Sequence, residues 1–133
     1  MNSATALKQY QQTSAHSGVM DASPHRLIQM LLDGALSRIL SAKGSIKQND
    51  IVKKGEQIGS AISIVEGLKA SLDFSQGGEI SKNLDALYEY ITGLLLQANI
   101  RNDASLLDEA GKLLSEVKMA WDAIDPNAAD KLR

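Results

Sequence analysis

The two histidines of the chain, His16 and His25, are its first candidates for metal or proton-transfer chemistry. A carboxylate-bridged metal centre in a helical bundle needs Glu-x-x-His pairs, and neither histidine has a glutamate three residues before it. A phosphotransfer histidine would lie well inside a helix beside a lysine, but Pro24 precedes His25 and the nearest helical lysine is Lys43. We therefore predict that His25 is a solvated histidine at a helix end, and that the chain has no metal site.

The residue types also give no support for a catalytic nucleophile or a phosphate-binding loop. The chain has no cysteine, so neither a thiolate metal site nor a Cys-His pair can form. No Ser-His-Asp set can be assembled, and Gly77-Gly78 lacks the spacing and the lysine of a phosphate-binding loop. We predict no catalytic residue, no cofactor and no enzymatic activity.

Length and charge narrow the class of protein further. A chain of 133 residues is long enough for one domain with a single core. Its 14 basic and 16 acidic residues give a net charge of −2, without the basic face that a nucleic-acid partner requires. No apolar run is long enough for a secretory signal or a membrane span, so we expect a cytoplasmic protein without membrane insertion.

Four apolar segments with helical spacing organise the chain. Ser23 and Pro24 begin the first, Asn49-Asp50 precede the second, the third starts near Glu79 after a break at 74–78, and Asp103 caps the fourth. Short connections favour antiparallel neighbours, so we predict an all-α, up-down-up-down four-helix bundle. The predicted division is an N-terminal arm at 1–22, the bundle at 23–125 and a tail at 126–133.

The first helix carries an unusually wide apolar surface. Nine of the fourteen residues from Leu27 to Leu40 are apolar, and eight fall within an arc of roughly 220°. Part of that arc is core, and we expect the row Leu32, Leu36 and Leu40 to face outward, with Leu96 on the third helix. A purely structural role for the row stays open. The physical reading is a binding module with apolar grooves between helices.

Several short motifs, taken together, resemble the FliS family of flagellar export chaperones. They are Ala22-Ser23-Pro24, Leu27-Ile28, Met30-Leu31, Asp33-Gly34-Ala35, Gly77-Gly78-Glu79-Ile80, Asn83-Leu84, Leu87-Tyr88-Glu89-Tyr90, Ala98-Asn99, Asn102-Asp103, Ala120-Trp121 and Ile124. Tyr10 also corresponds to a tyrosine typical of the family. The likeness runs from about Tyr10 to Ile124. It departs at Leu32, where the family usually has an aromatic residue.

The resemblance implies a cytoplasmic chaperone that binds the C-terminal segment of flagellin and delivers it to an export-gate component of the flagellar secretion apparatus. It also implies that the N-terminal arm, with Tyr10 and Met20, covers an apolar groove until flagellin displaces it. A flagellar regulator is a further possible partner, and the rival interpretation is a helical adaptor for a signalling or transcription regulator. If Leu36 lies in the groove, Leu36→Asp should abolish capture and leave the melting temperature nearly unchanged.

Overall fold

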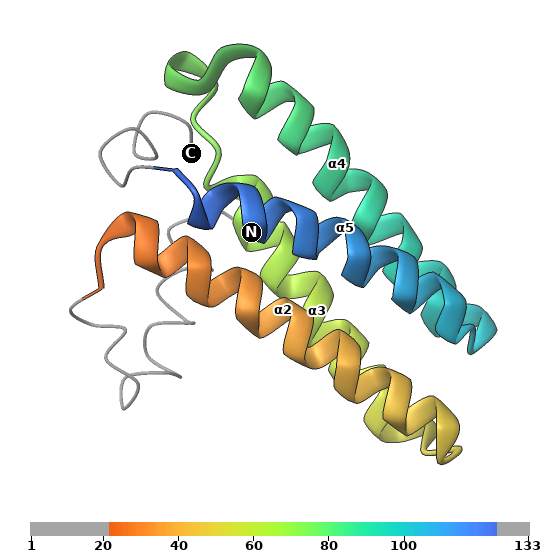
Figure 1. Cartoon of the computed structure of the whole chain (residues 1–133). Helices are drawn as coiled ribbons and strands as arrows, with labels where there is room; N and C mark the ends of the chain where they lie inside the picture. The colour runs from red at the N-terminus through yellow and green to blue at the C-terminus, as the bar shows by residue number, and fades with distance from the viewer. Residues whose placement is uncertain (1–21, 125–133) are drawn as a thin grey trace.

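The computed structural model describes residues 22–124, and every regular element within that range is a helix. The helices are α2 (Pro24–Lys47), α3 (Ile51–Ala70), α4 (Phe74–Arg101) and α5 (Ala104–Asp122). Consecutive helices run antiparallel (Figure 1). α2 packs on α3 and α5, and α4 packs on the same two helices. The predicted all-α four-helix bundle is confirmed, while the arm, Tyr10, Met20 and the tail at 126–133 lie outside the described residues.

Side-chain caps begin the helices where the sequence predicts them. The Ser23 hydroxyl accepts a hydrogen bond from the Arg26 N–H at 3.1 Å, and the Asp50 carboxylate accepts one from the Lys53 N–H at 3.1 Å. Asp103 accepts from the Ser105 N–H at 2.9 Å. Each bond satisfies a backbone donor that the first turn of a helix leaves without an internal partner. The connections are therefore short and place successive helices side by side.

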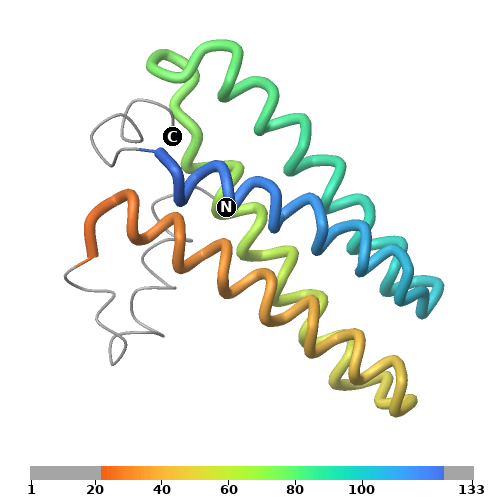
Figure 2. The backbone as a smooth tube through the Cα atoms, in the orientation of Figure 1, coloured from red at the N-terminus to blue at the C-terminus, as the bar shows by residue number. Residues whose placement is uncertain are grey.

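The start of α4 differs from the prediction. We expected a break over 74–78, but Asp73 caps a helical turn that begins at Phe74, accepting from the N–H groups of Ser75 and Gln76. Gly78, with φ 52° and ψ −124°, then interrupts the helix. The chain turns back on itself at this point before the long part of α4 (Figure 2). Only the end of the expected break, at Gly78, is a true interruption, because the sequence reading missed the cap at Asp73.

The core is aliphatic and draws on all four helices. It takes up most of the wide apolar arc of α2, including Ile28, Leu31, Ala35 and Ile39. Leu32 is 0% exposed, so the expectation that it faces outward is wrong. The reason is that α2 packs against both α3 and α5, which widens the sector of the helix that is buried.

A buried lysine links two helices at one end of the bundle. Lys54, near the start of α3, donates its ammonium hydrogens to the Asn99 carbonyl at 2.9 Å and to the Asn102 side-chain oxygen. Asn102 has a left-handed backbone and caps the C-terminus of α4. Because Lys54 bonds two acceptors in the last turn of α4, it ties α3 to α4 at this end.

Candidate functional site: an apolar groove between α4 and α5

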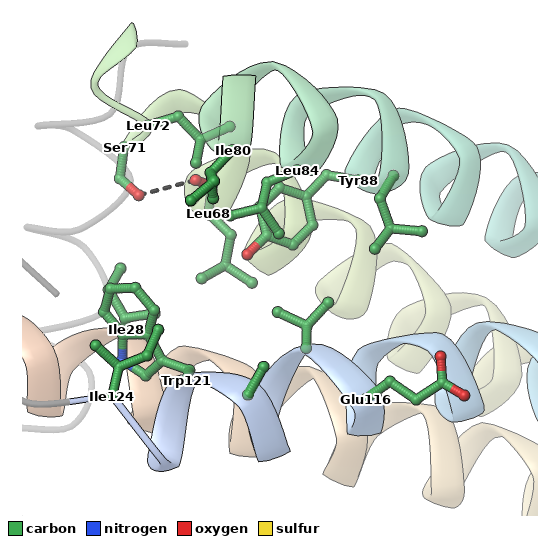
Figure 3. Close-up of a pocket in the computed structure, with 13 residues that line it drawn as sticks. Ile28, Leu68, Ser71, Leu72, Ile80, Leu84, Tyr88, Glu116, Trp121 and Ile124 are labelled. Atoms are coloured by element: carbon green, nitrogen blue, oxygen red, sulfur yellow. Dashed lines mark hydrogen bonds between the residues drawn. The ribbon is translucent and has the colours of Figure 1, made fainter. Parts of the chain in front are cut away.

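A groove of about 310 Å³ opens between the N-terminal half of α4 and the C-terminal half of α5. Its lining also includes residues from α2 and from the end of α3. The lining residues are Ile28, Leu68, Ser71, Leu72, Ile80, Leu84, Leu87, Tyr88, Glu116, Val117, Ala120, Trp121 and Ile124. In Figure 3, Leu84 and Tyr88 extend from α4 toward the wall formed by Trp121 and Ile124.

The groove exists because two apolar faces converge without closing on each other. Ile80, Leu84 and Leu87 recur at helical spacing along α4, and Val117 and Trp121 do so on α5. Of the four neighbouring helix pairs, α4 and α5 make the least extensive contact. Ile80 consequently remains 49% exposed, although it lies on the inward side of its helix. Helical spacing in the sequence shows that these side chains share a face of each helix, and it does not show how far apart the two helices lie.

The polar groups on the floor of the groove are uncharged hydroxyl groups. The Ser71 hydroxyl donates to the carbonyl of Leu68 at 2.8 Å, within its own helical turn. Burial raises the pKa of the Tyr88 hydroxyl well above its ordinary value, so this group stays neutral. Among the described residues of the lining, Glu116 is the only aspartate, glutamate, lysine, arginine or histidine, and it is exposed. The described lining is therefore suited to uncharged apolar side chains.

Trp121 lines the end of the groove nearest the start of α2, and its contacts with His25 behind the lining correct the prediction for His25. The histidine is buried and its imidazole stacks on the indole, with ring centroids 5.2 Å apart. His25 Nε2 lies 3.0 Å from the Trp121 carbonyl oxygen, and Trp121 Nε1 lies 3.0 Å from the His25 carbonyl oxygen. The prediction of a solvated histidine is wrong because the first turn of α2 packs against the last turn of α5.

A second, shallower groove of about 320 Å³ lies between α2 and α5. Leu36 and Leu40 line it, and the ion pair between Lys43 and Asp108 spans the same two helices. Leu40 is 69% exposed, as expected of an outward position. Leu36 is half-buried and packs on the core, so Leu36→Asp would disturb both the groove and the fold. Leu40 is thus the better position for testing this surface.

Of the remaining candidate positions, Leu96 lies within the described residues. Leu96 is 48% exposed on α4, in agreement with its expected outward direction, and lines neither groove. Tyr10 and Met20 lie outside the described residues, so their place in a covering arm stays a prediction. Sequence reasoning did not single out Trp121, Ile80 or Leu84 as site residues. The unique tryptophan at the end of an apolar helix was the available signal.

Within residues 22–124, no helix combines the length and the apolar character that crossing a membrane requires.

The chain is similar to known proteins over most of its length. The sequence profile described as "Flagellar protein FliS" matches residues 6–128. The chain is 52% identical over 119 residues to flagellar secretion chaperone FliSB of Pseudomonas aeruginosa, covering 90% of this chain and 94% of that protein. It is 49% identical over 130 residues to flagellar secretion chaperone FliS of Salmonella typhimurium, covering 97% and 96%. The protein of the same name from Vibrio cholerae is 40% identical over 121 residues, with 91% and 89% covered.

Proposed function

This chain belongs to the family of the flagellar protein FliS, and we propose that it is a cytoplasmic secretion chaperone that binds the C-terminal segment of flagellin. Binding keeps flagellin from polymerising early, and the complex delivers it to the export gate of the flagellar secretion apparatus. The observation that carries this proposal is the apolar groove between α4 and α5. The function needs binding energy alone and no chemical step.

The shape and polarity of the groove suit an amphipathic segment that folds as it binds. Such a segment inserts side chains three or four residues apart into a groove between helices. The facing rows on α4 and α5 have the same spacing, so they can interdigitate with one helical stripe. Because ordering the segment consumes part of the contact energy, the complex is extensive without being extremely tight.

The position of the second groove suggests that the bound flagellin segment wraps around α5. α5 forms one wall of each groove, and Leu40 and Ile80 mark opposite sides of it. A segment that continues from one groove to the other contacts both exposed leucine and isoleucine side chains. Since the main groove has one charged lining residue, Glu116, we expect the affinity to vary little with salt.

The test compares Ile80→Gln with Ile100→Gln. Both isoleucines lie on α4 and are exposed, by 49% and 73%, but only Ile80 lines the groove. Glutamine carries no charge, so neither variant perturbs the helix dipole. Covering the remaining area of Ile80 is worth about 1 kcal/mol, so Ile80→Gln should weaken flagellin binding about fivefold or more by calorimetry.

Ile100→Gln should bind flagellin as the unmodified protein does, and both variants should melt near its temperature. Flagellin that lacks its C-terminal region should not bind any of the three proteins. Equal affinities for the two variants would remove the groove from the proposal. Undiminished binding of truncated flagellin would remove the C-terminal segment.

A further inference from the structure

We propose that His25 is a positioning residue of the groove, which holds the Trp121 indole in the orientation that the bound segment meets. The inference rests on the proposed function, because it names the residue that prepares the same groove for its client. His25 does not line the groove itself. It acts through Trp121, whose ring is 5% exposed and forms part of the groove wall.

Hydrogen bonds run in both directions between the two residues. Trp121 Nε1–H donates to the His25 carbonyl oxygen at 3.0 Å. A carbonyl oxygen only accepts, so the 3.0 Å contact between His25 Nε2 and the Trp121 carbonyl requires the hydrogen on Nε2. The two rings also stack, with 16° between their planes. Each residue therefore satisfies a backbone carbonyl of the other.

This pairing reaches a second groove residue through the Trp121 carbonyl. That carbonyl lies in the last turn of α5, where the helix runs out of its own donors. It also accepts from the Ile124 N–H at 3.2 Å. Trp121 and Ile124 both line the groove, so the imidazole donor of His25 helps to fix two of its side chains.

A fixed orientation of the indole favours binding. A side chain that is mobile in the free protein must be ordered when the segment binds, and this ordering costs free energy. Ordering a large side chain on complex formation costs conformational entropy, and a ring that is already held in place avoids that cost. The indole Nε1–H is the one polar group of the ring, and it bonds the main-chain carbonyl of His25, while the imidazole stacks on the ring and bonds the Trp121 carbonyl. Without the imidazole bond, the last turn of α5 is held less firmly against α2, and the position of the indole in the groove wall is less well fixed.

Three variants distinguish the positioning of the Trp121 indole by His25 from a general effect of joining α2 to α5. His25→Phe keeps an aromatic ring for stacking but has no side-chain donor, and His25→Gln restores a donor of similar reach. Gln29→Ala is the matched control, because Gln29 Nε2 donates to Asp122 Oδ1 at 2.7 Å and so also joins α2 to α5. Gln29 lines neither groove.

The chain has one tryptophan, so a single indole N–H signal in a nitrogen-correlated NMR spectrum reports Trp121 alone. His25→Phe should make that N–H exchange faster with solvent and weaken binding of the flagellin C-terminal segment about three- to tenfold. His25→Gln should restore both quantities. Gln29→Ala should leave both as they are in the unmodified protein.

An unchanged indole signal and an unchanged affinity in His25→Phe would overturn the proposal. Equal weakening by Gln29→Ala would also overturn it, since any tether between α2 and α5 would then suffice. If His25→Phe does not fold, His25→Leu carries the test, because it keeps an apolar side chain at this position and removes the donor to the Trp121 carbonyl. If the unmodified protein does not bind flagellin, the proposed function fails, while the indole exchange rate still decides whether His25 positions Trp121.

Discussion

At the scale of single residues, the groove has an uncharged floor, and the charged side chains lie at its edge. Lys118, next to the lining residue Val117, pairs with carboxylates that do not line the groove: its ammonium group bonds Asp122 at 2.5 Å and lies 3.5 Å from Asp33. Tyr88 stays neutral because burial raises its pKa. The floor thus keeps the same polarity across the physiological range of pH, and recognition depends on shape and apolar contact.

Asp122 provides a test of the polar contacts around the groove. Its pKa lies below the ordinary value of 3.8, first because Lys118 donates a hydrogen bond to it and also because Gln29 does. A lowered pKa in the folded state adds stability above the unfolded value, and that stability disappears as pH falls through the folded value.

We therefore expect Asp122→Asn to lower the free energy of unfolding at neutral pH, modestly because the pair is solvent-exposed. The difference from the unmodified protein should shrink as pH falls below 3.8 and vanish once pH is below the lowered pKa of the folded state. Urea titrations of both proteins over a series of pH values measure it. A difference that stays constant from neutral to acid pH would show that the carboxylate charge is not involved.

At the scale of elements, α4 forms the groove wall because its first turn is set apart by Gly78. The positive φ of 52° at this residue is a conformation that side chains with a Cβ rarely adopt. Ile80 and Leu84 follow directly and point into the groove. Gly93, further along α4, lies in regular helix, and a Cβ there would meet no atom within 4 Å.

The two glycines predict opposite responses to alanine. Gly78→Ala should lower the free energy of unfolding by about 1–2 kcal/mol, because the strain is conformational. Gly93→Ala should raise it by about 0.5–1 kcal/mol, because alanine restricts the unfolded chain and suits a helix. Urea unfolding followed by circular dichroism gives both values. A stabilising Gly78→Ala would mean that the backbone at this residue is not held as described.

The elements were largely predictable, because caps and apolar spacing are local properties of the sequence. Ser23, Asp50 and Asp103 begin helices as expected. The environments of Leu32 and His25 were not predictable, because they depend on which helices pack against α2. The main groove was missed for the same kind of reason: helical periodicity gives the direction of a side chain, and only tertiary packing gives the distance between two helices.

At the scale of the whole molecule, the bundle is tied at one end and grooved at the other. Lys54 joins α3 to the last turn of α4, whereas the opposite half of α4 leaves the apolar groove against α5. The pair of His25 and Trp121 holds α2 to α5 beside that groove. The main apolar groove therefore lies at the end of the bundle away from Lys54, in a position that suits the proposed binding of an unfolded segment.

The absence of cysteine makes the central claim directly measurable, since any single introduced cysteine is a unique label site. Ile80→Cys places a thiol in the groove, and Ile100→Cys places one on the same helix outside it. Maleimide labelling rates are measured with and without a saturating flagellin C-terminal segment. We predict that the segment slows labelling at position 80 strongly and leaves position 100 unchanged. Equal labelling rates at position 80 with and without the bound segment would contradict the account.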